Sequence, residues 1–225
     1  MKLLPRVKIC GMRSAEDIAT AVKCGADAVG FITEVPVDTP RKLDKKTASE
    51  LAGSVPVFVD SVLVIMPTCG QQALDLIEKV DPDVVQLHND IEAGEIEIIR
   101  NSTHQRIIRT FTIPVKSKEL PPDMMVQVEI LADNDLIDGI LLDTGKAGIS
   151  GGTGMVHDWS LSRQVVENTD IPVILAGGLN PGNVREAVKE VRPFAVDTAS
   201  GVESNGKKDP AKVCRFIRET RCING

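Results

Sequence analysis

The sequence predicts an α/β protein that folds as a single (β/α)8 barrel, the TIM barrel. A short apolar run, a polar loop and a segment with apolar residues three and four positions apart follow one another eight times. No low-complexity linker or charge run interrupts this alternation, and α/β barrels commonly occupy about 200–250 residues as one unit. We therefore expect one domain over residues 1–225, with a doubly wound open sheet as the alternative.

The eight strands are expected at Val7–Cys10, Ala28–Ile32, Val55–Val59, Val84–Leu87, Arg106–Phe111, Gly139–Leu142, Val173–Ala176 and Ala195–Val196. Amphipathic helices are expected between them, including Ala15–Val22, Ala73–Val80 and Pro210–Arg221. In the first of these helices, Ile18, Ala19 and Val22 share one face. Near the C-terminus, Asn180-Pro181 opens a further helix, whose apolar positions are Val184, Ala187, Val188 and Val191.

Side chains alternate along a strand, so the barrel predicts which residues point inward. On the first strand, Val7 and Ile9 face the helices, while Lys8 and Cys10 face the interior. The same parity pairs inward residues on three later strands: Gln86 with His88, Leu141 with Asp143, and Ala195 with Asp197. Active sites of these barrels lie at the carboxyl ends of the strands, which makes the last member of each pair a candidate functional residue.

Composition narrows the class of protein. The chain is 42% hydrophobic and 26% charged, with a net charge of −6 and no dominant basic patch, which argues against nucleic-acid or anionic membrane partners. Neither a signal peptide nor a membrane-spanning run is evident, so a cytoplasmic location is expected. Five cysteines form an odd set without a C-x-x-C pair; we expect mostly reduced, buried thiols, with no disulfide framework and no zinc site.

Two small-residue loops follow predicted strands near the C-terminus. Gly177-Gly178 follows the strand at 173–176, and Ser200-Gly201 lies just beyond Asp197. Glycines at such positions let backbone N–H groups turn toward a bound anion, and a helix N-terminus adds partial positive charge. The two loops are therefore candidate phosphate-binding loops, although Gly177-Gly178 is also compatible with a simple tight turn between strand and helix.

Cys10 and Asp143 are the candidate catalytic groups. Either residue can have a structural role instead, Cys10 as a small buried hydrophobe and Asp143 as a cap for backbone N–H groups. Lys8 on the same face as Cys10 favours the thiolate, so we expect the pKa of Cys10 to be lowered toward that of a usable base. Asp143 ends an apolar run, which predicts a raised pKa and a general acid.

Other polar residues carry weaker signals. Arg41, in the long loop 33–42, can clamp a carboxylate with two hydrogen bonds, or can simply be solvated. His88 is expected to be a hydrogen-bonded interior imidazole. Three histidines without ligand spacing do not indicate metal catalysis. The glycine-rich segment 145–154 is expected to close over or against a ligand.

Several motifs together resemble the phosphoribosylanthranilate isomerase family. They are KICGMRSAEDIATAVKCGADAVGF at 8–31, TPRKL at 39–43, VQLH at 85–88, LLDT at 141–144, GGTG at 151–154, ILAGGLNPGNV at 174–184 and DTASGVE at 197–203. Single motifs among these are weak, whereas the combination spans nearly the whole chain and is specific.

The resemblance implies an Amadori rearrangement of N-(5-phosphoribosyl)anthranilate to 1-(2-carboxyphenylamino)-1-deoxyribulose 5-phosphate, the third step of tryptophan biosynthesis from chorismate, without a metal or organic cofactor. It implies that Asp143 protonates the ring oxygen, that Cys10 removes the C2 proton, and that Arg41 binds the anthranilate carboxylate. The phosphate of this small substrate falls to Gly177, Gly178, Ser200 and Gly201, with Asp197 also at the binding site. The oligomeric state is left as monomer or homodimer.

Two other functions remain open at this point. A histidine-pathway isomerase catalyses the same rearrangement on a substrate with two phosphates, but needs an aspartate on strand one and a second phosphate loop in the first half. Here the first strand ends in Cys10. A barrel that binds a phosphoribosyl ligand without catalysis is the other alternative, and it requires neither Cys10 nor Asp143.

Overall fold

The barrel is closed. The computed structural model describes residues 4–146, 149–150 and 155–222, and in these residues eight strands pair in parallel. They are β1 (Arg6–Cys10), β2 (Ala28–Thr33), β4 (Asp60–Ile65), β5 (Val84–Leu87), β6 (Arg106–Pro114), β7 (Gly139–Lys146), β9 (Val173–Leu175) and β10 (Ala195–Thr198). The order runs β1-β10-β9-β7-β6-β5-β4-β2, and β2 pairs back with β1. This closure confirms the (β/α)8 barrel and excludes the open sheet.

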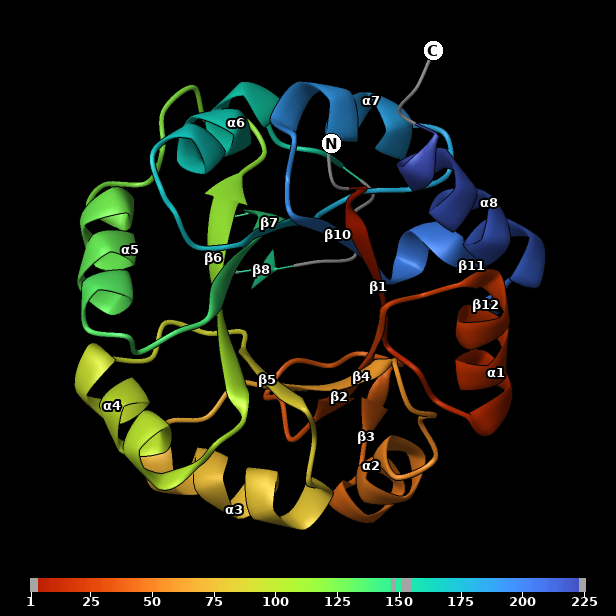
Figure 1. The fold of residues 1–225 in the computed structure, drawn as a ribbon, viewed down its shortest axis with the longest axis horizontal. Coiled ribbons are helices and arrows are strands. Elements are labelled where there is room, and N and C mark those ends of the chain that lie inside the picture. Colours follow the sequence, from red (N-terminus) through yellow and green to blue (C-terminus); the bar gives the residue numbers. More distant parts are fainter. Residues whose placement is uncertain (1–3, 147–148, 151–154, 223–225) are drawn as a thin grey trace.

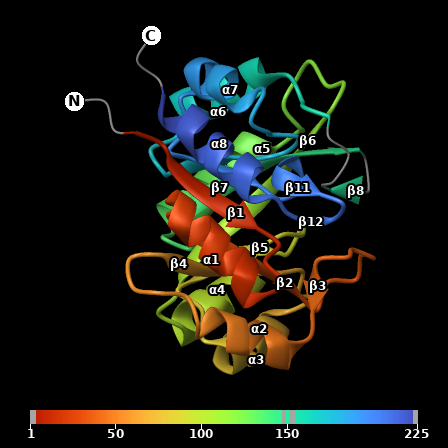
Figure 2. The same ribbon diagram turned by 90° about the vertical axis from the view of Figure 1, so that its right-hand side faces the viewer.

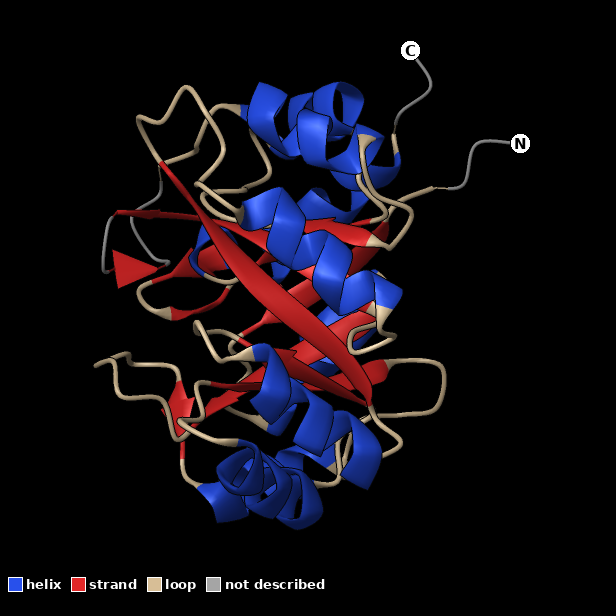
Figure 3. Cartoon of the chain, turned by 90° about the vertical axis from the view of Figure 1, so that its left-hand side faces the viewer, coloured by secondary structure: helices blue, strands red, loops and turns tan. Residues whose placement is uncertain are grey.

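A ring of helices surrounds the strands (Figure 1). The described helices are α1 (Ala15–Cys24), α2 (Lys45–Ala52), α3 (Gly70–Val80), α4 (Ala93–Ser102), α5 (Met124–Asp133), α6 (Trp159–Glu167), α7 (Val184–Val191) and α8 (Pro210–Arg221). Viewed from the side, the strands lie inside and the helices outside (Figure 3). In the described part of the chain, no helix is both long enough and apolar enough to cross a membrane.

Short elements decorate the carboxyl ends of the strands. They are β3 (Lys42–Leu43), β8 (Ile149–Ser150), the 3-10 helix η1 (Ser200–Val202), and the hairpin formed by β11 (Glu203–Ser204) and β12 (Lys207–Lys208). Figure 2 shows β3, β8, β11 and β12 at one end of the barrel, with the start of β1 at the other. The two ends therefore differ in structure. The end that carries these short elements is the one where β1 ends, at Cys10.

The predicted strand parity is confirmed. Val7 and Ile9 are fully buried in the large apolar core between strands and helices, whereas Cys10 belongs to a small cluster inside the barrel. Leu141 and Ala195 belong to a second interior cluster. Alternating residues thus separate one core outside the sheet from another within it, and this alternation fixes which side chains can reach the mouth.

The helix faces are largely as predicted. All four apolar positions predicted for α7 are buried, and α8 begins and ends where the sequence places it. Asp209 caps α8 by accepting hydrogen bonds from the N–H groups of Ala211 and Lys212. In α1 the prediction is wrong for Ala19, which is exposed, because the buried stripe runs through Ile18 and Ala21.

The third strand lies later in the chain than predicted. Residues 55–59, read as a strand, form a turn, and the strand is β4 at Asp60–Ile65. Phe58 adopts a left-handed conformation with φ +71°, which breaks an extended run. Val57 and Phe58 are 82% and 100% exposed. Apolar character misled the prediction, because these side chains lie on the surface rather than in the sheet.

The cysteine prediction also needs correction. Cys24 of α1 and Cys214 of α8 form a disulfide whose Cα atoms lie 4.7 Å apart. They are separated by 190 positions, so closing the barrel brings them together and no local spacing reveals them. Of the remaining cysteines, Cys10 is buried, Cys69 half-buried and Cys222 exposed. The expectation of a reduced, buried thiol therefore fits Cys10 alone.

Candidate active site

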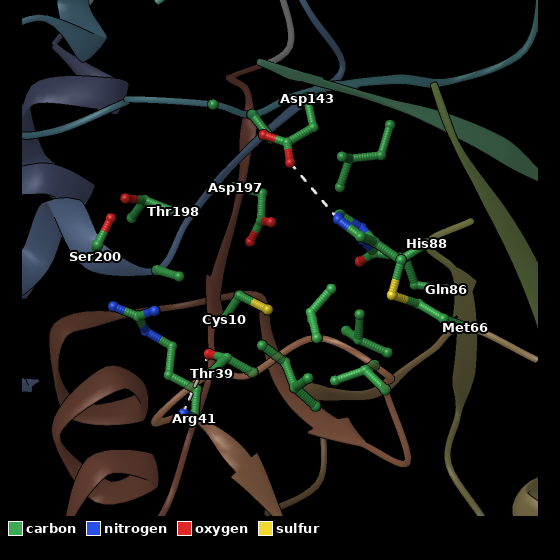
Figure 4. A pocket seen from close by; sticks show the side chains of 18 of the residues that line it. Cys10, Thr39, Arg41, Met66, Gln86, His88, Asp143, Asp197, Thr198 and Ser200 are labelled. Carbon is green, nitrogen blue, oxygen red and sulfur yellow. Dashed lines mark hydrogen bonds and ion pairs between the residues drawn. The ribbon is translucent and has the colours of Figure 1, made fainter. Parts of the chain in front are cut away.

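A cavity of about 310 Å³ opens at the carboxyl ends of the strands. Seven of the eight predicted site residues line it: Cys10, Arg41, Asp143, Gly177, Gly178, Asp197 and Ser200. Figure 4 shows Cys10 and Asp143 on different sides of the cavity, with Asp197 between them. Because these residues come from β1, β7, β10, η1 and two loops, folding alone assembles the site.

The Cys10 thiol lies deep in this cavity. The residue is 5% exposed, and a side chain at Gly30 of β2 would place its Cβ 2.8 Å from the Cys10 sulfur, so glycine makes room for the thiol. Burial raises the pKa of Cys10; the Lys8 cation counteracts this effect and the Asp197 carboxylate adds to it. The predicted lowering of the pKa is therefore wrong, because the surroundings of Cys10 favour the protonated thiol.

Lys8 and Asp197 explain why the cation has a limited effect on the thiol. Lys8 Nζ lies 3.1 Å from the Asp197 carboxylate, and both side chains are buried. Burial opposes the charge on Lys8, but Asp197 and Cys10 outweigh it and raise the pKa of Lys8. Much of the lysine's charge is balanced by Asp197, which leaves less to stabilise a thiolate.

Asp143 has the environment of a general acid. It lies within the buried part of β7, and its Oδ1 accepts a hydrogen bond of 2.8 Å from the backbone N–H of Thr144. Burial raises the pKa of Asp143 to about 7, with a further contribution from the Asp197 carboxylate. The predicted raised pKa is therefore confirmed. Near neutral pH, Asp143 is protonated in a large fraction of the molecules.

His88 lies beside Asp143 at the end of β5. Its Nδ1 is 3.1 Å from Nε2 of Gln86, and its Nε2 is 3.6 Å from the Asp143 carboxylate. Burial, with the nearby Lys8 and Arg109 cations, lowers the pKa of His88 to about 4. The expectation of a hydrogen-bonded interior imidazole is confirmed, and His88 is uncharged at neutral pH.

The two small-residue loops meet at one side of the cavity. Gly177 and Gly178 have φ values of +82° and +69°, and a Cβ on either would collide with Thr144 or with the Met155 carbonyl. Gly201 does not line the cavity; a Cβ there would collide with the Leu179 carbonyl oxygen. Gly201 thus lets the loop after β10 approach the loop after β9, leaving Ser200 at the cavity.

Arg41 reaches the cavity from the loop between β2 and β3. Its Nε and Nη2 donate hydrogen bonds of 2.8 and 2.6 Å to the two carboxylate oxygens of Glu203. Glu203 is a site residue that the sequence analysis did not single out, although it ends the DTASGVE motif. The solvated alternative for Arg41 is excluded, because its side chain is only 16% exposed.

Two further predictions concern the segment 145–154 and a metal site. The segment 145–154, expected to close over a ligand, lies partly outside the described residues, as does the GGTG motif at 151–154. Within the described ranges, no three His, Cys, Asp or Glu side chains gather closely enough to hold a metal ion.

Comparison with known proteins places these features in context. A sequence model of the family described as N-(5'-phosphoribosyl)anthranilate (PRA) isomerase matches residues 7–219. The N-(5'-phosphoribosyl)anthranilate isomerase of Methanosarcina acetivorans is 51% identical over 226 residues, covering 98% of this chain and 95% of that protein.

Solved structures give the same result. A phosphoribosyl anthranilate isomerase in complex with reduced 1-(o-carboxyphenylamino)-1-deoxyribulose 5-phosphate superposes with a TM-score of 0.76 at 32% identity, covering 96% of this chain and 98% of that one. Monomers generated from the dimeric enzyme of Thermotoga maritima superpose with a TM-score of 0.77 at 30% identity, with the same coverage.

Proposed function

The chain belongs to the N-(5'-phosphoribosyl)anthranilate isomerase family, and we propose that its cavity catalyses this isomerisation with Asp143 as acid and Cys10 as base. The activity is the third step of tryptophan biosynthesis from chorismate. The observation that carries the assignment of roles is the buried Asp143 carboxyl, whose pKa of about 7 lets it hold a proton facing the same cavity as the Cys10 thiol. Neither group is needed for ligand binding alone.

The substrate is a small phosphorylated molecule with an anion at each end. We assign its phosphate to the loops at Gly177-Gly178 and Ser200, where backbone N–H groups can face an anion. Gly201 contributes by packing and not by direct contact. The anthranilate carboxylate is assigned to Arg41. The relative whose structure holds reduced 1-(o-carboxyphenylamino)-1-deoxyribulose 5-phosphate supports a ligand of this class.

Asp143 begins the reaction by protonating the furanose ring oxygen. The C1–O bond breaks, its electrons return to oxygen, and the nitrogen lone pair forms a protonated Schiff base with C1. A carboxyl group with a pKa of about 7 suits this task, because it is protonated often enough to donate and is a stronger acid than water. An apolar site raises the pKa of a carboxyl group, which keeps this acid neutral.

Cys10 then acts as the base. The thiolate removes the proton from C2, and the C–H electrons move toward the iminium nitrogen to give an enolamine, which tautomerises to the ketone as C1 gains a proton. Cys10 must lose its own proton first, and Lys8 is the cation that stabilises the thiolate. C2 is oxidised and C1 reduced within one molecule, so the balance requires no external oxidant or reductant.

We also propose that the protein acts as a cytoplasmic homodimer. Val57 and Phe58, in the loop between α2 and β4, expose apolar side chains at the amino end of the barrel. Phe58 and Phe194 line a cavity of about 630 Å³ at the same end. A second copy of the chain can cover these surfaces, and a dimeric relative supports this occupant.

The test is steady-state turnover of freshly prepared N-(5-phosphoribosyl)anthranilate by purified protein, followed by the change in anthranilate fluorescence with chelator present. Turnover that survives chelation supports the metal-free isomerase. A folded sample without turnover contradicts the assignment; the substrate with two phosphates and phosphoribosyl-ligand binding are then tested in turn.

A further inference from the structure

We propose that Glu203 is a positioning residue that orients Arg41 for the substrate carboxylate and ties this arginine to the phosphate-binding turn. The inference rests on the proposed function, because it concerns how the same cavity recognises both anionic ends of its ligand. Its basis is a cluster of three charged side chains, in which Lys208 is buried and Arg41 and Glu203 are half-buried.

The hydrogen bonds of Arg41 determine which edge of its guanidinium faces the ligand. The Glu203 carboxylate accepts one hydrogen bond from Nε and one from Nη2, at 2.8 and 2.6 Å. A guanidinium carries five N–H donors, so those of Nη1 and the second of Nη2 remain for another carboxylate. A Cβ at Gly11, the residue after Cys10, would collide with Cδ of Arg41, so the arginine stem also packs closely against the end of β1.

Glu203 also holds a second cation. Lys208 Nζ donates to Glu203 at 2.8 Å, and the lysine side chain is 1% exposed. The hairpin explains this pairing: Glu203 and Lys208 are cross-strand partners across the Asn205-Gly206 turn. Removing the carboxylate leaves two neighbouring cations that repel each other, so Arg41 loses both its attachment and its orientation.

The same lysine reaches the phosphate-binding turn. Lys208 Nζ donates a hydrogen bond of 2.9 Å to the backbone carbonyl of Ala199, directly before Ser200. Glu203 itself follows η1 without an intervening residue. The three side chains therefore fix the distance between the turn assigned to the phosphate and the guanidinium assigned to the carboxylate.

The three charged groups of this cluster shift one another's pKa values. Burial alone would raise the pKa of Glu203, but hydrogen bonds from Arg41 and Lys208 bring it to about 2. Glu203 raises the pKa of Arg41 in turn. Burial lowers the pKa of Lys208, and the Glu203 carboxylate counteracts this effect. Glu203 therefore stabilises the charge of both cations, of which Arg41 lines the cavity.

The experiment measures affinity and not only activity. Calorimetry on the whole protein compares two probes: reduced 1-(o-carboxyphenylamino)-1-deoxyribulose 5-phosphate, and the same compound with a phenyl ring that lacks the carboxylate. We expect Glu203→Gln to weaken binding of the carboxylated probe at least about tenfold more than binding of the other probe. The reason is that small misplacements of a binding group have large effects. Equal weakening of both probes, or no weakening, overturns the proposal.

Two variants separate positioning from general damage. Glu203→Asp keeps the carboxylate but shortens the side chain by one methylene. We expect this variant to lose less of the preference for the carboxylated probe than Glu203→Gln does. An unchanged preference in this variant contradicts the proposal even if Glu203→Gln does not fold. Glu219→Gln is the matched control, since Glu219 of α8 also bridges two arginines, Arg185 and Arg218, away from the cavity. It should leave the preference unchanged.

A double variant tests whether Glu203 acts through Arg41. In an Arg41→Met background, adding Glu203→Gln should cause no further loss of the preference, because the residue it positions is gone. A further loss of similar size shows an independent effect and overturns the proposal. If the wild-type protein binds the two probes equally, or binds neither, then the assignment of Arg41 or the proposed function fails instead.

Discussion

The Asp143 carboxylate lies 3.6 Å from Nε2 of His88, yet the two residues do not form an ion pair near neutral pH. Burial lowers the pKa of His88 to about 4 and raises that of Asp143 to about 7. The Gln86 amide nitrogen faces Nδ1 of His88, which places the imidazole proton on Nε2, toward Asp143. A neutral donor there can orient the carboxyl group without removing its proton.

This relationship predicts the pH dependence of catalysis. In the proposed mechanism the active form needs protonated Asp143 and ionised Cys10, although Asp143 has the lower pKa. The fraction of active enzyme therefore rises with pH up to about 7, the pKa of Asp143, stays level, and falls above the raised pKa of Cys10. The measurement is kcat/KM as a function of pH; an acidic limb that ends near pH 4, with Asp143 at its ordinary pKa, would contradict the assignment.

Removing either of the two proposed catalytic groups should nearly abolish turnover. We expect Cys10→Ser and Asp143→Asn each to lower kcat at least roughly a hundredfold, the low end for loss of one acid or base. Cys222→Ser, at an exposed free cysteine, is the control and should retain normal kcat. Fluorescence-monitored turnover checks all three variants, and near-normal kcat in either catalytic variant removes that residue from its role.

The raised pKa of Asp143 has a cost in stability. The unfolded carboxyl group ionises near pH 3.8 and the folded one near pH 7, so the unfolded state gains stability as the pH rises between these values. Asp143→Asn removes this ionisation. We expect the variant to be more stable than wild type by between about 1 and 4 kcal/mol at pH 8, from a shift of roughly three pKa units.

Urea unfolding at pH 4, 6 and 8 measures this effect. The difference in unfolding free energy between Asp143→Asn and wild type should grow from pH 4 to pH 7 and then stay constant. Other carboxyl groups affect both proteins equally, so the difference isolates Asp143. A constant difference at all three pH values would show that the folded pKa of Asp143 is not raised.

The sequence predicted the architecture because local patterns repeat in every unit. Seven predicted strands overlap observed ones, and Lys8 and Cys10 point inward as the alternation requires. The third strand was placed wrongly because Val57 and Phe58 have the composition of a strand but lie on the surface. A single sequence does not show whether an apolar run faces a core or a partner.

The site was predictable where a residue type and its strand position were enough, as for Asp143. It was not predictable where several charges compete. Lys8 on the face of Cys10 indicated a lowered thiol pKa, but Asp197 of β10 neutralises much of this cation. The link between Glu203 and Arg41 spans 162 positions and was also missed, although the Asn-Gly hairpin turn next to Glu203 was a usable local signal.

The disulfide should contribute substantially to stability. Cys24 and Cys214 join the first and last helices of the ring, so reduction frees the seam where the barrel closes. We expect Cys214→Ala to lower the free energy of unfolding by about 2–4 kcal/mol. Thermal denaturation of this variant checks the value against Cys222→Ser, which should match wild type. Titration of unreduced, denatured protein should find three free thiols; five would show that the bond is absent.

The proposed homodimer can be tested at the exposed loop between α2 and β4. Burying one Phe58 side chain contributes about 1.5–3 kcal/mol, and a symmetric dimer buries two copies. We therefore expect Phe58→Asp to raise the dimer dissociation constant at least about a hundredfold. Light scattering coupled to size-exclusion chromatography at micromolar protein should then report half the wild-type mass.

Two controls make this result specific. Val126→Asp changes an exposed apolar residue of α5, 54% accessible and outside the cavity at the amino end, and should leave the dimer intact. The Phe58→Asp monomer should keep its isomerase turnover, because Cys10 and Asp143 lie at the opposite end of the barrel. A wild-type protein that is already monomeric at high concentration contradicts the dimer. A Phe58→Asp variant that stays dimeric places the interface on another surface.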